Sequence, residues 1–284
     1  MAAGRARQDA GVALTSFDNE GLTFDVQDRG PVDGEPVVLL HGFPQRASSW
    51  DRTAPLLHAR GVRTLAPDQR GYSAGARAAG VADYTLEHLS GDVLALLDAA
   101  GLASAHVVGH DWGAAVGWAL SARAPERVRS LTAVSVPHPR AFLHALRSPD
   151  QLRRSWYIAA FQVPVLSELV AARLLEGWLV SSGQEPALAA RDVAGLRAPG
   201  AATGALRWYR AAPLGGRGPG PVDVPTVLVW GDADSAVGRA AVEGSAAHVR
   251  GPYRLEVLEG LGHWLPEQAP DRVADLVLAQ VSGA

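Results

Sequence analysis

The chain has 284 residues, of which 48% are hydrophobic, and a formal net charge of −3. This length suffices for one large domain, or for a domain with an insertion, and the hydrophobic share allows a sizeable core. The small net charge gives no electrostatic basis for binding nucleic acid or an anionic membrane, and the absence of cysteine excludes disulfides and a thiolate nucleophile.

The N-terminal segment is charged and lacks a continuous apolar stretch that could form the core of a signal peptide. No other segment approaches the apolar length of a membrane span. We therefore expect a cytoplasmic protein that binds neither nucleic acid nor a membrane.

Short apolar runs alternate with helical patterns through the first half of the chain. Buried strands rich in valine and leucine are predicted at residues 36–42, 62–68, 105–111 and 128–136. Helical spacing is present at residues 46–60 and 86–100, and a helix rich in small residues follows residue 111. Strand, helix and strand in this order favour a parallel sheet with right-handed crossovers.

The pattern changes between Pro137 and Pro221, where the apolar spacing is helical and no strong strand candidate appears. Strands are predicted again at residues 226–232 and 253–260, separated by a helix around residues 238–248, and a last helix follows Pro270. We therefore expect an α/β core formed by residues 1–136 and 223–284, with residues 137–222 inserted as a helical cap.

The segment Gly109-His110-Asp111-Trp112-Gly113 lies where a predicted strand runs into a helix. Glycines on both sides of a central residue suit a sharp turn that exposes the central side chain above the sheet. A carboxylate in this position can displace a leaving group from saturated carbon and form an alkyl ester. Asp111 is also a good N-cap for the following helix, and this segment alone leaves the two interpretations near even.

Two loops late in the chain supply candidates for an acid and a base, in the order that follows the nucleophile. Asp232 and Asp234 lie at the end of the strand predicted at 226–232, and His263 follows the strand predicted at 253–260. Such loops lie at the carboxyl ends of strands, where α/β sheets place their sites. Asp234 would orient His263 and stabilise its protonated form, and Asp232 is the near alternative.

On these residues and further motifs, the chain resembles the α/β-hydrolase-fold epoxide hydrolases, which are related to haloalkane dehalogenases, from about Phe24 to the last helix. Residues 41–44 (HGFP) match the family's oxyanion loop, in which the bond before proline is usually cis, and residues 68–73 (DQRGYS) match another motif. The family's G-x-x-D pattern favours Asp234 over Asp232. The resemblance implies an eight-stranded, mostly parallel sheet flanked by helices, with an inserted helical cap.

Two matches within the insertion concern the chemistry. Residues 155–162 (SWYIAAFQ) and 207–210 (RWYR) resemble the family's cap segments that carry two epoxide-activating tyrosines, which fall on Tyr157 and Tyr209. The resemblance implies that these tyrosines hold the epoxide oxygen while Asp111 attacks a ring carbon.

In the second half of the implied reaction, His263 and Asp234 activate a water that cleaves the ester on Asp111. The backbone N–H groups of Phe43 and Trp112 would form the oxyanion hole. The product is a vicinal diol, and no cofactor is required. A metal site is not expected, because the adjacent side chains of His110 and Asp111 cannot both point into one site at a tight turn.

A small, hydrophobic epoxide is the expected substrate, because the cap is rich in apolar and aromatic residues; an aryl or polycyclic epoxide is the class that we favour. The expected substrate-binding residues are His41, Pro44, Trp156, Phe161, Trp208 and Trp264, with Leu166 and Trp178 as further apolar lining. The cap is also a candidate contact of a homodimer.

Three alternatives stay open. A haloalkane or haloacid dehalogenase uses the same nucleophile, acid and base, and Trp112 is compatible with halide binding, but Phe43 stands where haloalkane dehalogenases typically have asparagine. A non-catalytic, ligand-binding member of the fold is disfavoured by the intact set of site residues. An ester or lactone hydrolase is disfavoured because aspartate is a poor acyl nucleophile.

Overall fold

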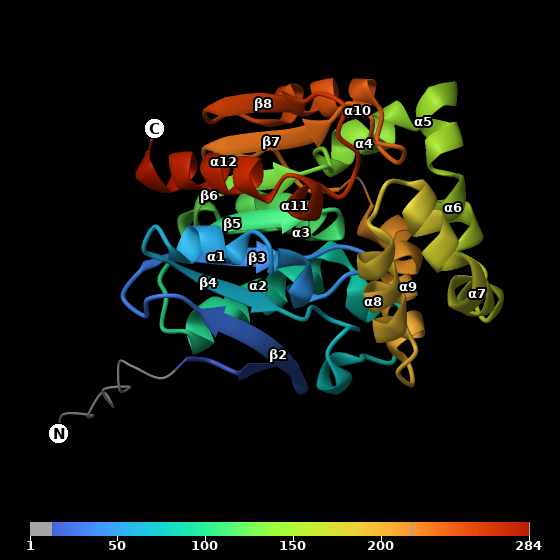
Figure 1. The fold of residues 1–284 in the computed structure, drawn as a ribbon, viewed down its shortest axis with the longest axis horizontal. Coiled ribbons are helices and arrows are strands. Elements are labelled where there is room, and N and C mark those ends of the chain that lie inside the picture. The colour runs from blue at the N-terminus through green and yellow to red at the C-terminus, as the bar shows by residue number, and fades with distance from the viewer. Residues whose placement is uncertain (1–12, 217, 284) are drawn as a thin grey trace.

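The computed structural model describes residues 13–216 and 218–283, which form a twisted sheet between two layers of helices (Figure 1). The strands are β1 (Ser16–Asn19), β2 (Leu22–Arg29), β3 (Glu35–Leu40), β4 (Val62–Pro67), β5 (Ala105–His110), β6 (Val128–Val134), β7 (Thr226–Gly231) and β8 (Tyr253–Leu258). Their order is β1-β2-β4-β3-β5-β6-β7-β8. β2 pairs antiparallel with β1 and β4, and the pairings from β4 to β8 are parallel. The expected eight-stranded, mostly parallel sheet is therefore confirmed.

Helices cover both faces of this sheet, and its central strands are therefore buried on both sides. The helices around the core are α1 (Ala54–His58), α2 (Leu86–Ala99), α3 (Trp112–Arg123), α10 (Arg239–Glu243), α11 (Leu265–Gln268) and α12 (Pro270–Ser282). α1 and α12 contribute to the hydrophobic cluster on one face, and α2 and α3 contribute to the cluster on the other face.

Helices also fill the segment between β6 and β7. They are α4 (Pro139–Ala145), α5 (Pro149–Arg154), α6 (Trp156–Ala160), α7 (Leu166–Ser181), α8 (Pro186–Leu196) and α9 (Ala201–Ala211). Helices α6 to α9 lie beyond the arrowheads of the parallel strands, which are the carboxyl ends of the sheet (Figure 1). Within the part of the chain that the structure describes, no helix has both the length and the apolar character needed to cross a membrane.

Two local differences from the sequence prediction have physical reasons. The helix predicted at residues 46–60 is split into a short 3-10 turn, Ala47–Trp50, and α1, which has Pro55 in its first turn. Proline is accepted there because the first N–H groups of a helix have no intrahelical partner. The helix predicted around residues 238–248 is likewise shortened to α10, followed by the 3-10 turn Gly244–His248.

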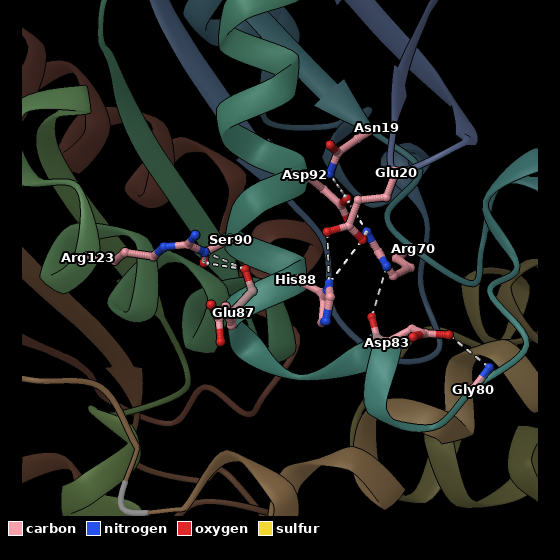
Figure 2. Close-up of polar contacts among 10 residues, drawn as sticks. All are labelled: Asn19, Glu20, Arg70, Gly80, Asp83, Glu87, His88, Ser90, Asp92 and Arg123. Atoms are coloured by element: carbon pink, nitrogen blue, oxygen red, sulfur yellow. Dashed lines mark hydrogen bonds and ion pairs between the residues drawn. The ribbon is translucent and has the colours of Figure 1, made fainter.

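A buried arginine ties the antiparallel edge of the sheet to the loop after β4 (Figure 2). Arg70 donates from Nε and Nη2 to the two carboxylate oxygens of Asp92 in α2, at 2.8 and 2.7 Å. Nη2 also donates to Glu20 at 2.8 Å, and Nη1 donates to the carbonyl of Asp83 at 3.0 Å. Because this bidentate pair is buried and its hydrogen bonds are satisfied, it fixes the position of the Arg70 backbone.

The same loop receives helix α9. The indole N–H of Trp208 donates to the carbonyl oxygen of Arg70 at 2.8 Å. The backbones of Gly71 and Gly204 are in contact, since a Cβ atom added to Gly204 would lie only 2.6 Å from the carbonyl oxygen of Gly71. Helix α9, which carries Tyr209, therefore rests directly on the core.

Candidate active site

Asp111 occupies a sharp turn between β5 and α3, with φ 52°. The turn requires glycine on both sides: a Cβ atom on Gly109 would lie 2.2 Å from the carbonyl oxygen of Gly113, and a Cβ atom on Gly113 would lie 2.1 Å from that of Leu40. The Asp111 side chain makes no capping hydrogen bond to α3. The geometry therefore favours the nucleophile over the helix cap as the interpretation of this residue.

The two carboxylate oxygens of Asp111 face different partners. The backbone N–H of Phe43 donates to Oδ1 at 2.7 Å. Nε2 of His263 lies 3.5 Å from Oδ2. The Phe43–Pro44 peptide bond is cis, as expected. Trp112 is the first residue of α3, so its N–H is among the helix donors that lack an intrahelical partner.

His263 is held by Asp234. Nδ1 of the imidazole lies 2.8 Å from Oδ2 of Asp234, and both side chains are buried. Oδ1 of Asp234 accepts hydrogen bonds from the N–H groups of Ala236 and Val237, at 2.7 and 3.0 Å. Asp232, the near alternative, is exposed and accepts from the backbone N–H of Gly260 at 2.7 Å.

The electrostatics of this group favour an ion pair. Burial lowers the pKa of His263, but the carboxylates of Asp234 and Asp111 outweigh this effect and raise the pKa to about 10. Burial raises the pKa of Asp111, but the hydrogen bond and positive charge of His263 outweigh it and hold the pKa below its usual value. Near neutral pH, therefore, Asp111 is a carboxylate and His263 an imidazolium.

Tyr157 from α6 and Tyr209 from α9 lie above the Asp111 carboxylate. Their ring centroids are 6.1 Å apart, and both side chains are buried. The Tyr209 ring packs edge-on against Trp112 at 5.1 Å and against Phe43 at 5.3 Å. Burial and the negative charge of Asp111 raise the pKa of both tyrosines. The two phenols therefore stay protonated and can act as hydrogen-bond donors.

These groups share one cavity. Its lining consists of Phe43, Asp111, Tyr157, Trp178, Ser182, Tyr209, Ser235, Ala236, His263 and Trp264. Its volume is about 20 Å³, counted as space open to the centre of a water molecule. Such a volume accommodates about one water molecule. The Asp111 carboxylate, the His263 imidazole and the two phenols thus meet in a small space with mostly apolar walls.

The other residues that were expected to line the site differ in position: some lie at the cavity, and others are buried elsewhere or exposed to solvent. Trp264 lines the cavity. Phe161 is not part of the lining but packs against Tyr209, with the ring centroids 4.9 Å apart. Trp208 is buried beneath α9 rather than in the cavity wall. Trp156 is 61% exposed and Leu166 57% exposed, so the expectation that they line the site is wrong. Both occur in helical segments whose inward face the sequence did not reveal.

The loop residues His41 and Pro44 are buried but are not among those that line the cavity. Nδ1 of His41 donates to the carbonyl of Gly42 at 3.0 Å, and Nε2 accepts from the N–H of Gln69 at 3.0 Å. Burial lowers the pKa of His41 to about 4, so the ring is neutral. His41 therefore supports the loop that presents the Phe43 N–H.

The sequence analysis missed three lining residues: Ser182, Ser235 and Ala236. Ser182 follows α7, and its hydroxyl accepts from the indole N–H of Trp264 at 3.0 Å. Ser235 and Ala236 directly follow Asp234, which was a signal that they would lie near the site. Among residues 13–216 and 218–283, no group of three or more His, Asp or Glu side chains is arranged to hold a metal ion.

Comparisons with known proteins agree with this fold. Residues 35–270 match the family described as alpha/beta hydrolase fold. The chain is 33% identical to the AB hydrolase superfamily protein YfhM of Bacillus subtilis, over 94% of this chain and 97% of that protein. It is 30% identical to Epoxide hydrolase A of Mycobacterium tuberculosis, over 94% of this chain and 96% of that protein.

A solved structure described among novel epoxide hydrolases in metagenomes from hot environments superposes with a TM-score of 0.83 and 30% identity, covering 94% of this chain and 97% of that one. The family match covers most of the chain, and relatives of this similarity extend over nearly the whole of it. The chain belongs to the α/β-hydrolase fold family.

Proposed function

We propose that this protein hydrolyses an epoxide to a vicinal diol. The observation that carries the proposal is one cavity in which the Asp111 carboxylate faces both the His263–Asp234 pair and the phenols of Tyr157 and Tyr209. The names of the relatives support it, because several curated proteins similar over most of this chain are called epoxide hydrolases.

In the first half-reaction, Oδ2 of Asp111 attacks a ring carbon of the epoxide. A new C–O bond forms, the carbon–oxygen bond of the ring breaks, and negative charge passes from the carboxylate to the epoxide oxygen. Tyr157 and Tyr209 are placed to stabilise and protonate that oxygen, because their raised pKa values keep them as O–H donors. The product of this step is an alkyl ester on Asp111.

In the second half-reaction, His263 removes a proton from water while the water oxygen attacks the ester carbonyl of Asp111. The charge that develops on Oδ1 is stabilised by the N–H of Phe43, which already donates to this oxygen at 2.7 Å, and by the N–H of Trp112. An N–H donor of this type contributes roughly 3–4 kcal/mol to the transition state. Collapse of the intermediate breaks the ester C–O bond, and the departing diol oxygen takes the proton held by His263. The proton left on the Asp111 carboxyl then passes to His263, which restores the carboxylate and the imidazolium.

The charge state of His263 fits this order of events. In the resting protein the Asp111 carboxylate helps to keep the imidazole protonated. Formation of the ester removes that negative charge, so the pKa of His263 falls. The imidazolium then passes its proton on to replace the one that the phenols gave to the epoxide oxygen, which leaves a neutral ring able to accept a proton from water. Ester formation thereby converts His263 into the base that the next step requires.

The walls of the cavity favour an apolar substrate of limited size. Phe43, Trp178 and Trp264 surround the catalytic groups, and the cavity volume is about 20 Å³. We propose that residues 137–222 act as a cap over the core of residues 1–136 and 223–284, and that the cap moves to admit a hydrophobic epoxide. A monocyclic aryl epoxide would need less of this movement than a polycyclic one, so it is the substrate class that we favour.

The test is detection of the covalent intermediate with styrene oxide as the probe. The variant His263→Gln should accumulate an adduct on Asp111 that mass spectrometry of a peptic digest locates, and Asp111→Asn should form none. In single-turnover reactions in heavy-oxygen water, the first diol should carry an oxygen from the carboxylate. A first diol with solvent oxygen, or release of halide from haloalkanes without diol formation from epoxides, would contradict the proposal.

A further inference from the structure

The backbone carbonyl of His263 receives two hydrogen bonds from side chains beneath the site. The hydroxyl of Ser135 donates to this oxygen at 2.7 Å, and Nε2 of His110 donates to it at 2.9 Å. Both side chains are fully buried. A carbonyl oxygen has two lone pairs, so these two donors use its full capacity as an acceptor.

The Ser135 backbone is strained in order to place this hydroxyl. Ser135 directly follows β6 and has φ 67°, a left-handed conformation that is costly for residues other than glycine. Its N–H donates to the carbonyl of Val229 in β7 at 2.8 Å, which holds the strained residue in the sheet. Strain of this kind persists where the surrounding structure enforces it and is concentrated at functional sites.

The second donor is electrically neutral. Burial lowers the pKa of His110 to about 4, even though the ring centroids of His110 and His263 are only 5.0 Å apart. His110 therefore adds no positive charge beside His263 near neutral pH. Its contribution to the His263 carbonyl is a hydrogen bond from the ring N–H.

The backbone of the loop that carries His263 depends on a few such contacts. The loop runs from the end of β8 at Leu258 to the start of α11 at Leu265. Before His263 in the loop, the N–H of Gly260 donates to the Asp232 carboxylate, and the N–H of Gly262 donates to the side-chain oxygen of Gln268. At His263 itself, the side chain is held by Asp234 and the backbone carbonyl by the two buried donors.

We propose that Ser135 is a positioning residue for hydrolysis of the ester intermediate. By fixing the His263 carbonyl, it sets the 3.5 Å separation between Nε2 of His263 and Oδ2 of Asp111, the region in which the attacking water must be deprotonated. The inference rests on the proposed function of His263 as the base. The attack of Asp111 on the epoxide does not need His263 to accept a proton, so Ser135 acts on the second half-reaction.

Two substitutions separate this role from a structural one. Ser135→Gly and Ser135→Ala both remove the hydroxyl, but glycine accepts φ 67° without penalty and alanine does not. Ser130→Ala is the matched control, because Ser130 is a buried residue of β6, the strand that Ser135 follows, and its hydroxyl contacts Nδ1 of His106 at 2.7 Å, away from the site. Each variant is mixed with styrene oxide, and ester formation and ester decay are followed by rapid quenching and mass spectrometry.

Both Ser135 variants should hydrolyse the ester on the order of 10-fold or more slowly, the scale expected when a catalytic group is displaced by a fraction of an ångström. Ester formation should stay within about two-fold of the parent, so the ester accumulates and kcat and KM fall together. Ser135→Gly should unfold at a higher temperature than Ser135→Ala. The Ser130→Ala variant should show parent-like ester decay.

Unchanged ester decay in both Ser135 variants would overturn the inference, as would slow decay confined to the less stable alanine variant. These results are distinguishable from failure of the proposed function. If the parent protein and His263→Gln form diol without any adduct on Asp111, the covalent route itself is wrong. If the adduct forms and decays normally in the Ser135 variants, only the role of Ser135 is wrong.

Discussion

Nε2 of His263 lies 3.5 Å from Oδ2 of Asp111, a separation too long for a strong hydrogen bond and short enough for the two charges to stabilise each other. The other carboxylate oxygen is already engaged by the backbone N–H of Phe43. In the proposed reaction, Asp111 thus has one oxygen fixed where negative charge would later be held and one oxygen free to react. The predictions below follow from this division.

The two half-reactions should respond differently to pH. Ester formation needs ionised Asp111, whose pKa lies below its usual value of 3.8, so its rate should be nearly constant from about pH 5 to about pH 9. Ester hydrolysis needs neutral His263, so its rate should rise with pH through an apparent pKa below 10, because the ester no longer carries the charge of Asp111. Rapid-quench measurements of both steps across this range test the prediction, and a hydrolysis rate that increases on acidification would contradict it.

The same charges should make stability depend on pH. The folded-state pKa of His263, about 10, lies above its ordinary value of 6.5, so its interactions stabilise the fold fully below pH 6.5 and are lost as the pH rises through 10. The free energy of unfolding of the parent should therefore exceed that of His263→Gln most at about pH 5 to 6, and this difference should shrink toward pH 10. Urea unfolding of both proteins at several pH values provides the measurement, and a difference that grows with pH would refute the assignment.

Replacing the phenols should slow ester formation. Tyr157→Phe or Tyr209→Phe removes one of the two donors that face the epoxide oxygen, and each should lower the rate of ester formation roughly 10- to 100-fold, with a larger loss in the double variant. Tyr84→Phe is the control, because the Tyr84 hydroxyl donates to the carbonyl of Ala78 away from the cavity. Equal rates in the parent and the double variant would exclude the two phenols from catalysis.

The buried pair of Arg70 and Asp92 should be sensitive to removal of one partner. Arg70→Met leaves the Asp92 carboxylate buried without its guanidinium and should reduce the free energy of unfolding by about 3–5 kcal/mol. The double variant Arg70→Met/Asp92→Leu removes both charges and should recover much of this loss. Denaturant titrations of the single and double variants measure the coupling, and a double variant less stable than Arg70→Met would contradict the argument.

A methyl group between α9 and the core should weaken the site. In Gly204→Ala, the new Cβ would lie 2.6 Å from the carbonyl oxygen of Gly71, so α9 must shift and carry Tyr209 with it. We expect slower ester formation and a lower melting temperature. Gly177→Ala, in α7 with nothing within 4 Å of the new Cβ, should instead gain about 1 kcal/mol of stability from helix propensity. Identical behaviour of the two variants would show that the glycine contact does not position α9.

The sequence predicted the parts of the fold whose signals are local. The central strands are short and almost wholly buried, with valine or leucine at their centres, and the glycines around Asp111 mark a turn that few other sequences can form. The two strands at the antiparallel end of the sheet, β1 and β2, escaped individual prediction, because one is only four residues long and both have exposed positions. Their pairing is decided by the neighbouring strands and not by their own sequences.

Side-chain direction in the cap was less predictable. Tyr157 was assigned from a motif and points into the cavity, whereas its neighbour Trp156 was expected there and is exposed. In a five-residue helix, apolar periodicity is too short to identify the buried face. The contact between Ser135 and His263 spans 128 residues of sequence, so no local pattern could reveal it.

The hydrogen bond from the Trp264 indole to the hydroxyl of Ser182 joins the residue after His263 to the end of α7. A substitution in α7 that widens the cavity would therefore also alter the position of His263. The reason is that Ser182, at the end of α7, is hydrogen-bonded to Trp264, the residue next to His263. A variant with a wider cavity would therefore need to keep a hydroxyl at position 182. Without it, the variant would accept larger epoxides but turn them over more slowly, because His263 would be less well positioned.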